Sequence, residues 1–131
     1  MNTMQTKIIA ASLLFLLVFL TGFWLTRTGK PYAQILFTLH KLIALGAVIY
    51  LSTVIAGVNQ SAPLQAGQWL AVAAAVVCAA ATIISGGLLS VEGGMPPFLL
   101  PMHRVLPFLT IIAIGVSLYL ILVRNNWITS S

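Results

Sequence analysis

Four long apolar runs, separated by short polar stretches, constrain this chain more than any other feature. They cover residues 8–25, 35–58, 69–89 and 105–123. A helix that crosses a bilayer needs roughly 20 mostly apolar residues, and each run is long enough to cross. Charged residues make up 5% of the chain, whereas a soluble domain carries about 25%. The sequence therefore predicts an all-α integral membrane four-helix bundle, with residues 1–131 as a single transmembrane domain.

The first run follows Lys7 and in that respect begins like a secretory signal. It continues through Trp24 and Leu25 and then meets Arg27 and Lys30, without a small-residue cleavage site. Cleaved signals have shorter apolar segments that end at such a site. We therefore expect the first run to be retained as a helix.

Basic residues at the ends of the predicted helices give the chain a net charge of +5. At helix ends, basic residues anchor lipid headgroups and set orientation, so we expect no nucleic acid as a partner. Four lie near the first and third connections and two on the opposite side: Arg27, Lys30, Lys41 and Arg104, then Lys7 and Arg124. Because cytoplasmic loops carry the basic excess, this distribution predicts both termini outside. We expect the membrane to be the inner (plasma) membrane of a prokaryote.

A histidine followed by a base occurs near the start of the second and fourth runs. The pairs are His40-Lys41 and His103-Arg104, and a glycine-proline turn precedes each. In the first of these turns, Gly29 is expected to end the first helix. Two hairpins of the same sense are parallel repeats related by an axis along the membrane normal, which places equivalent residues at equal depth. We therefore expect two parallel helical-hairpin repeats, with both histidines level within one leaflet.

These two histidines, the only ones in the chain, are the candidate site. Ionisable residues within a spanning segment are rare and by default functional. Two imidazoles at one depth suit the axial positions of a b-type haem, and no Cys-x-x-Cys-His motif predicts covalent attachment. We predict His40 and His103 as ligands of one non-covalent haem b, with Lys41 and Arg104 paired to its propionates. Three further polar residues are candidates for hydrogen bonds at this site: Tyr32, Thr38 and Thr110.

The two histidine-bearing segments resemble the small transmembrane b-type cytochromes, in which histidines on different helices of a four-helix core hold haem. The resemblance covers the second and fourth runs and implies electron transfer or haem sensing, as an oligomer or with a redox partner. Those cytochromes commonly hold two haems with four histidines, whereas this chain has two histidines. The difference argues against electron transfer across the membrane by one subunit alone.

Two other functions stay open at this stage. One is a non-catalytic or assembly subunit that packs in a larger membrane complex through the alanine-rich third run, since small residues allow close helix contact. The other is a small transporter that uses His40, His103 and Glu92; it ranks third because Glu92, the only acid, falls in a predicted turn. Cys78 is expected to be a packing residue. Hydrolase, zinc and phosphate-loop motifs are missing, so an enzymatic role stays open only for redox chemistry.

Overall fold

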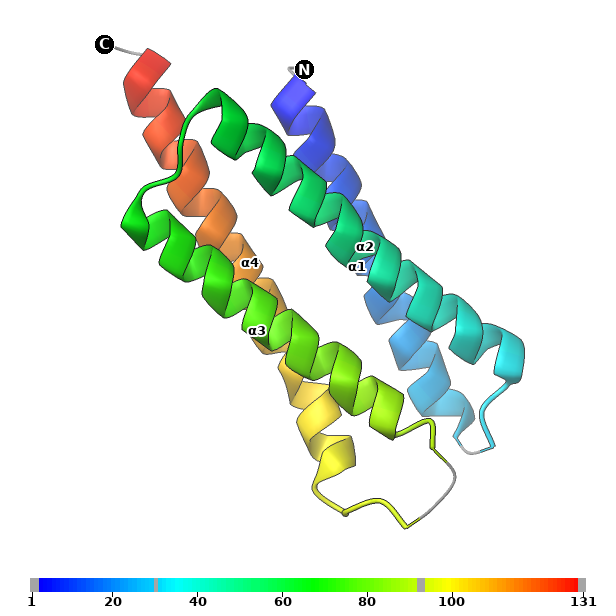
Figure 1. The fold of residues 1–131 in the computed structure, drawn as a ribbon. Helices are drawn as coiled ribbons and strands as arrows, with labels where there is room; N and C mark the ends of the chain where they lie inside the picture. Colours follow the sequence, from blue (N-terminus) through cyan, green and yellow to red (C-terminus); the bar gives the residue numbers. More distant parts are fainter. Residues whose placement is uncertain (1–2, 30, 92–93, 130–131) are drawn as a thin grey trace. The chain divides into compact units, whose positions relative to one another are not determined.

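The structure, a computed structural model, describes residues 3–29, 31–91 and 94–129. These residues form four helices and no strand (Figure 1): α1 Thr3–Thr28, α2 Gln34–Ser61, α3 Ala66–Leu88 and α4 Leu99–Thr129. With a rise of about 1.5 Å per residue, each helix exceeds the roughly 30 Å thickness of a hydrocarbon core. The prediction of an all-α chain with four helices is confirmed.

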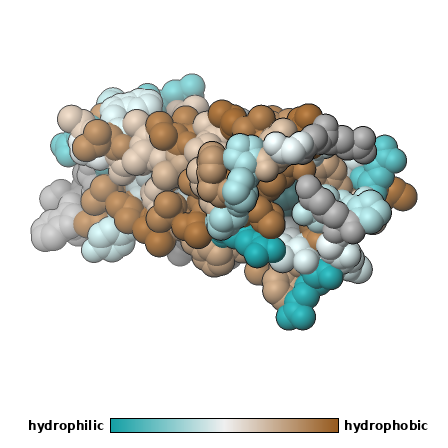
Figure 2. All heavy atoms as spheres, turned by 90° about the horizontal axis from the view of Figure 1, so that it is seen from below, coloured by the Kyte–Doolittle hydropathy of each residue, from teal (hydrophilic) through white to brown (hydrophobic). Residues whose placement is uncertain are grey.

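All four helices are long and apolar enough to cross a membrane. The spans that meet this criterion are Thr6–Thr28, Gln34–Ser61, Ala66–Leu88 and Leu99–Val123. Large apolar side chains lie exposed along them, including Ile35 at 85% and Leu70 at 74% exposure. Hydrophobic residues also cover much of the face that Figure 2 shows. Apolar surface of this extent is compatible with a lipid environment, as predicted.

The helices extend beyond the apolar runs that predicted them. α4 begins at Leu99 rather than near residue 105, so His103 and Arg104 belong to the helix itself. Pro101 lies in the first turn, where a missing backbone N–H costs nothing. The amide of Met102 donates to the Phe98 carbonyl at 3.1 Å and continues the turn. Hydropathy alone therefore underestimates the length of a helix whose first two turns contain proline and a basic residue.

Gly29 ends α1, as its sequence position predicted. Its φ is +67°, a left-handed conformation that glycine adopts without steric cost. Its amide donates to the Leu25 carbonyl at 3.2 Å. This is a common way to satisfy a carbonyl at a helix C-terminus.

Contacts divide the chain into two compact units, Met1–Ala62 and Pro63–Ser131. The first unit is the hairpin of α1 and α2 (Figure 1), here called hairpin 1. Four α2 residues at alternating spacings of four and three are buried, and all are apolar: Ala47, Leu51, Val54 and Val58. This spacing is typical of the left-handed packing of helices in coiled coils.

The second unit is the hairpin of α3 and α4, here called hairpin 2. Four buried residues of α4 repeat the spacing seen in α2: Thr110, Ile114, Ser117 and Ile121. Two hydrogen-bonded contacts connect α3 to α4 in this region. The hydroxyl oxygens of Thr82 and Thr110 lie 3.0 Å apart, and Gln68 Nε2 donates to the Leu120 carbonyl at 3.1 Å. Hairpin 2 thus has a more polar interface than hairpin 1.

Candidate functional site

His40 lies in the second turn of α2 and contacts α1 through one edge of its ring. The Nδ1 atom of His40 is 2.9 Å from the Thr21 hydroxyl oxygen. The same hydroxyl donates to the carbonyls of Leu17 at 2.8 Å and Val18 at 3.1 Å. The ring is half-buried, so it forms part of the contact between α1 and α2.

Gly22, the residue after Thr21, lies directly against this imidazole. A Cβ atom at Gly22 would be 3.0 Å from His40 Cε1 and 3.7 Å from Nε2. The first distance is tighter than an ordinary van der Waals contact. The absence of a side chain at this position therefore makes room for the Cε1 edge of the ring.

His103 has the same two contacts in hairpin 2. Its Nδ1 atom is 2.9 Å from the Ser85 hydroxyl oxygen, and Ser85, at 1% exposure, is almost fully buried. The Ser85 hydroxyl donates to the Thr82 carbonyl at 2.9 Å. A Cβ atom at Gly86 would be 2.7 Å from His103 Cε1 and 3.3 Å from Nε2. The ring and the glycine are even closer here than in hairpin 1.

A short motif, within α1 and at the C-terminal end of α3, accounts for both environments. In α1 it is Thr21-Gly22-x-x-x-Thr26 and in α3 it is Ser85-Gly86-x-x-x-Ser90. The last hydroxyl of each motif donates to the carbonyl of its glycine, at 3.0 Å in both hairpins. The glycines are 64 positions apart and the histidines 63 positions apart. Each histidine is therefore matched to a hydroxyl-glycine pair on the preceding helix.

No family model, curated protein or solved structure matches this chain. The candidate site is therefore defined by the contacts within each hairpin. In each hairpin the imidazole contacts a hydroxyl through Nδ1 and a glycine through Cε1.

The polar residues expected beside the histidines have other contacts. Thr110 is buried, but its hydroxyl approaches Thr82 rather than His103. Tyr32 stacks on Phe37, with ring centroids 5.7 Å apart. Thr38 is exposed on α2. The hydroxyls that contact the two imidazoles are those of Thr21 and Ser85, which the sequence did not predict.

The two bases next to the histidines are exposed. Lys41 places its ammonium nitrogen 4.2 Å from the centroid of the Phe37 ring. Arg104 lies exposed in the second turn of α4. Their pairing with haem propionates stays a prediction. Lys30, Glu92 and the side chain of Arg124, which entered the orientation and transporter predictions, lie outside what the structure describes.

Metal sites with several protein ligands find no support in the described part of the chain. Within it, no group of three or more His, Cys, Asp or Glu residues is clustered. Structural zinc sites use four such ligands and catalytic sites three. Cys78 is a half-buried free thiol in α3. Haem iron differs because the macrocycle supplies its equatorial ligands, and the protein supplies one or two axial ones.

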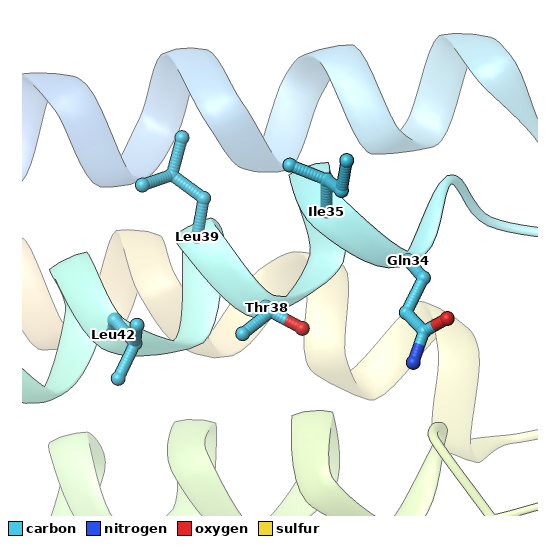
Figure 3. Close-up of a pocket in the computed structure, with 5 residues that line it drawn as sticks. All are labelled: Gln34, Ile35, Thr38, Leu39 and Leu42. Carbon is cyan, nitrogen blue, oxygen red and sulfur yellow. The ribbon is translucent and has the colours of Figure 1, made fainter.

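A shallow groove of about 430 Å³ lies along α2 and is separate from the histidine contacts. Five side chains of α2 line it, as Figure 3 shows: Gln34, Ile35, Thr38, Leu39 and Leu42. The lining is mainly apolar and includes no titratable group. The groove therefore adds no chemistry to the site.

Proposed function

We propose that this chain is a membrane b-type haem protein that binds one haem through His40 and His103 and serves in electron transfer or haem sensing. The observation that supports it best is the equivalence of the two histidine environments. The chain's only two histidines each contact a hydroxyl through Nδ1 and a glycine through Cε1. In the proposed arrangement the hairpins would be parallel repeats in a prokaryotic inner membrane, and the Nε2 atoms of His40 and His103 would hold the haem iron.

The chemistry of the two histidines fits an axial ligand pair. A metal-bound histidine almost always donates its other ring N–H to an oxygen, which orients the ring. The Thr21 and Ser85 hydroxyls are placed to serve as that oxygen for His40 and His103. Gly22 and Gly86 leave space at the ring edge that a Cβ would fill. A bound haem b would supply reversible one-electron chemistry, and the chain would supply ligands and an apolar surrounding.

The bases complete the proposed site. A haem carries two propionates, and carboxylates form strong charge-assisted hydrogen bonds with Lys and Arg. Lys41 and Arg104 each follow a ligand and are exposed, so their long side chains can reach a membrane surface. For Lys41 this pairing would replace its contact with the Phe37 ring. That contact is worth about 0.5–1 kcal/mol at an exposed site.

One observation favours the second candidate, a non-catalytic subunit of a membrane complex. Each histidine bridges two helices of its own hairpin, and such interhelical hydrogen bonds stabilise membrane proteins by about 0.6 kcal/mol on average. Histidines that only hold hairpins together would need no cofactor. A purified protein that is folded, colourless and bound to a partner would support this candidate.

The optical spectrum of the protein tests the proposal. The full chain is expressed with haem supplied and purified in detergent, and the Soret band and the haem content per chain are measured. We expect one haem per chain, and loss of the band in His40→Ala and in His103→Ala. Ser52→Ala is the matched control, because Ser52 is an exposed residue whose hydroxyl bonds only within α2, to the Val48 carbonyl. Wild-type protein without haem would refute the proposal.

A further inference from the structure

We infer that Thr21 and Ser85 are positioning residues that hold His40 and His103 in the tautomer with the proton on Nδ1 and the lone pair on Nε2. The inference deepens the proposed function, since a metal would bind that lone pair. It concerns the chain's own protons, however, and is testable without haem. It would explain why a hydroxyl precedes the glycine in both α1 and α3.

The Thr21 hydroxyl has one proton with which to donate a hydrogen bond and lone pairs with which to accept one. This oxygen lies 2.8 Å from the Leu17 carbonyl and 3.1 Å from the Val18 carbonyl. Carbonyl oxygens only accept, so the hydroxyl proton must point toward them for those bonds to form. The 2.9 Å contact with His40 Nδ1 is then a hydrogen bond only when Nδ1 carries a proton.

The Ser85 hydroxyl in hairpin 2 is likewise limited to one donated hydrogen bond. Its hydroxyl donates to the Thr82 carbonyl at 2.9 Å and lies 2.9 Å from His103 Nδ1. Both contacts are satisfied together only if the imidazole donates. Because Ser85 is almost fully buried, water is poorly placed to replace either bond. Leaving a hydrogen bond unmade at a buried polar atom is destabilising.

The tautomer follows from the chemistry of the neutral ring. A neutral imidazole carries one N–H and one unprotonated nitrogen. With the proton fixed on Nδ1, the lone pair lies on Nε2. The bond made by one ring nitrogen is the usual determinant of which nitrogen binds a metal. The two hydroxyls would therefore prepare both rings as ligands before any cofactor binds.

Nitrogen-15 NMR of the histidine side chains tests this inference directly. The experiment uses the full chain, labelled at histidine, in detergent micelles and prepared without haem. The chain has two histidines, so spectra of His40→Ala and His103→Ala assign the signals. In the neutral rings of the wild type we expect the Nδ1-protonated tautomer to predominate at both histidines.

Substituting each hydroxyl-bearing residue in turn distinguishes a local effect on one imidazole from a change of the whole protein. Thr21→Val should shift the tautomer populations of His40 alone, and Ser85→Ala those of His103 alone, toward the mixture of an unconstrained ring. Thr21→Ser and Ser85→Thr keep a hydroxyl and should restore the wild-type spectrum. Thr26→Val and Ser90→Ala are matched controls, because these hydroxyls bond the carbonyls of Gly22 and Gly86. They should leave both rings unchanged.

Two results would overturn the inference. One is a wild-type spectrum in which either neutral ring is protonated mainly on Nε2, and this result requires no variant to fold. The other is an unchanged tautomer in folded Thr21→Val or Ser85→Ala. Failure to bind haem with the expected tautomers would refute the proposed function alone. Haem binding by a protein with the other tautomer would refute this inference alone.

Discussion

The two hairpins share the environment of their histidines but differ in what holds their helices together. In α2 the buried residues that follow His40 in the sequence are all apolar, whereas the corresponding positions in α4 include Thr110 and Ser117. The hydrogen-bonded contacts of hairpin 2 include those between Thr82 and Thr110 and between Gln68 and the Leu120 carbonyl. In a bilayer, helix association depends on close packing and hydrogen bonds rather than on apolar burial. The two histidines thus have the same kind of contacts, while the buried residues that pack the helices together differ between the hairpins.

A second difference lies one turn after each histidine. Position 44 in α2 is alanine, while the equivalent position 107 in α4 is proline. Pro107 has no N–H to donate to the carbonyl four residues earlier, which belongs to His103. Proline in a helix interior also favours a kink. The backbone at His103 therefore lacks a helical hydrogen bond that the backbone at His40 can form.

The largest effect that separates the hairpins should come from adding a methyl group at each glycine. In Gly86→Ala the new Cβ would be 2.7 Å from His103 Cε1, and in Gly22→Ala it would be 3.0 Å from His40 Cε1. Overpacking of this kind costs about 1–3 kcal/mol. We expect Gly86→Ala to lower thermal stability and haem content more than Gly22→Ala. Both quantities are measured on detergent-purified protein.

The control for this comparison is the next residue in α3. A Cβ at Gly87 would meet nothing within 4 Å, so Gly87→Ala should be neutral or slightly stabilising, because alanine favours helix over glycine. An effect of Gly87→Ala as large as that of Gly86→Ala would show that the imidazole contact is not the cause.

The next effect concerns the hydroxyls. Loss of a group that orients a metal ligand typically lowers affinity 10- to 100-fold. We expect Ser85→Ala and Thr21→Val to weaken haem binding by about that factor, with the larger loss for the more buried Ser85. Haem titration of the apoprotein measures the change. Equal affinity in wild type and both variants would contradict a role for these hydroxyls.

Much of the fold and half of the site were predictable from the sequence. Hydropathy located four helices, and Gly29 marked the end of α1. The His-base pairs identified His40 and His103 as equivalent. Thr21 and Ser85 were missed because each lies on a different helix, 19 or 18 positions before its histidine. A Ser or Thr beside glycine is also common in membrane helices that only pack together.

A smaller effect would test whether the contact between Thr82 and Thr110 stabilises hairpin 2. The coupling between Thr82 and Thr110 is measured by a double-mutant cycle with Thr82→Val and Thr110→Val, using reversible unfolding. Interhelical hydrogen bonds in membrane proteins average about 0.6 kcal/mol, with values up to about 1.7. We expect a coupling in that range. Additive effects of the two substitutions would remove the proposed difference between the hairpins.

The smallest effects should come from substituting the two exposed bases, Lys41 and Arg104. Substitution of Lys41 is expected to change stability more than substitution of Arg104, whereas their effects on haem affinity should be similar. Lys41 contacts the Phe37 ring, so Lys41→Gln should lower the stability of the apoprotein by about 0.5–1 kcal/mol at most. Arg104→Gln removes an exposed charge and should change stability less. If both bases pair with propionates, the two variants should weaken haem binding to a similar degree. The loss of haem affinity should be larger at low salt than at high salt, because salt screens exposed charge pairs. Phe37→Leu keeps the ammonium but removes the ring that contacts both Lys41 and Tyr32. It should therefore lower stability at least as much as Lys41→Gln, without its loss of haem affinity.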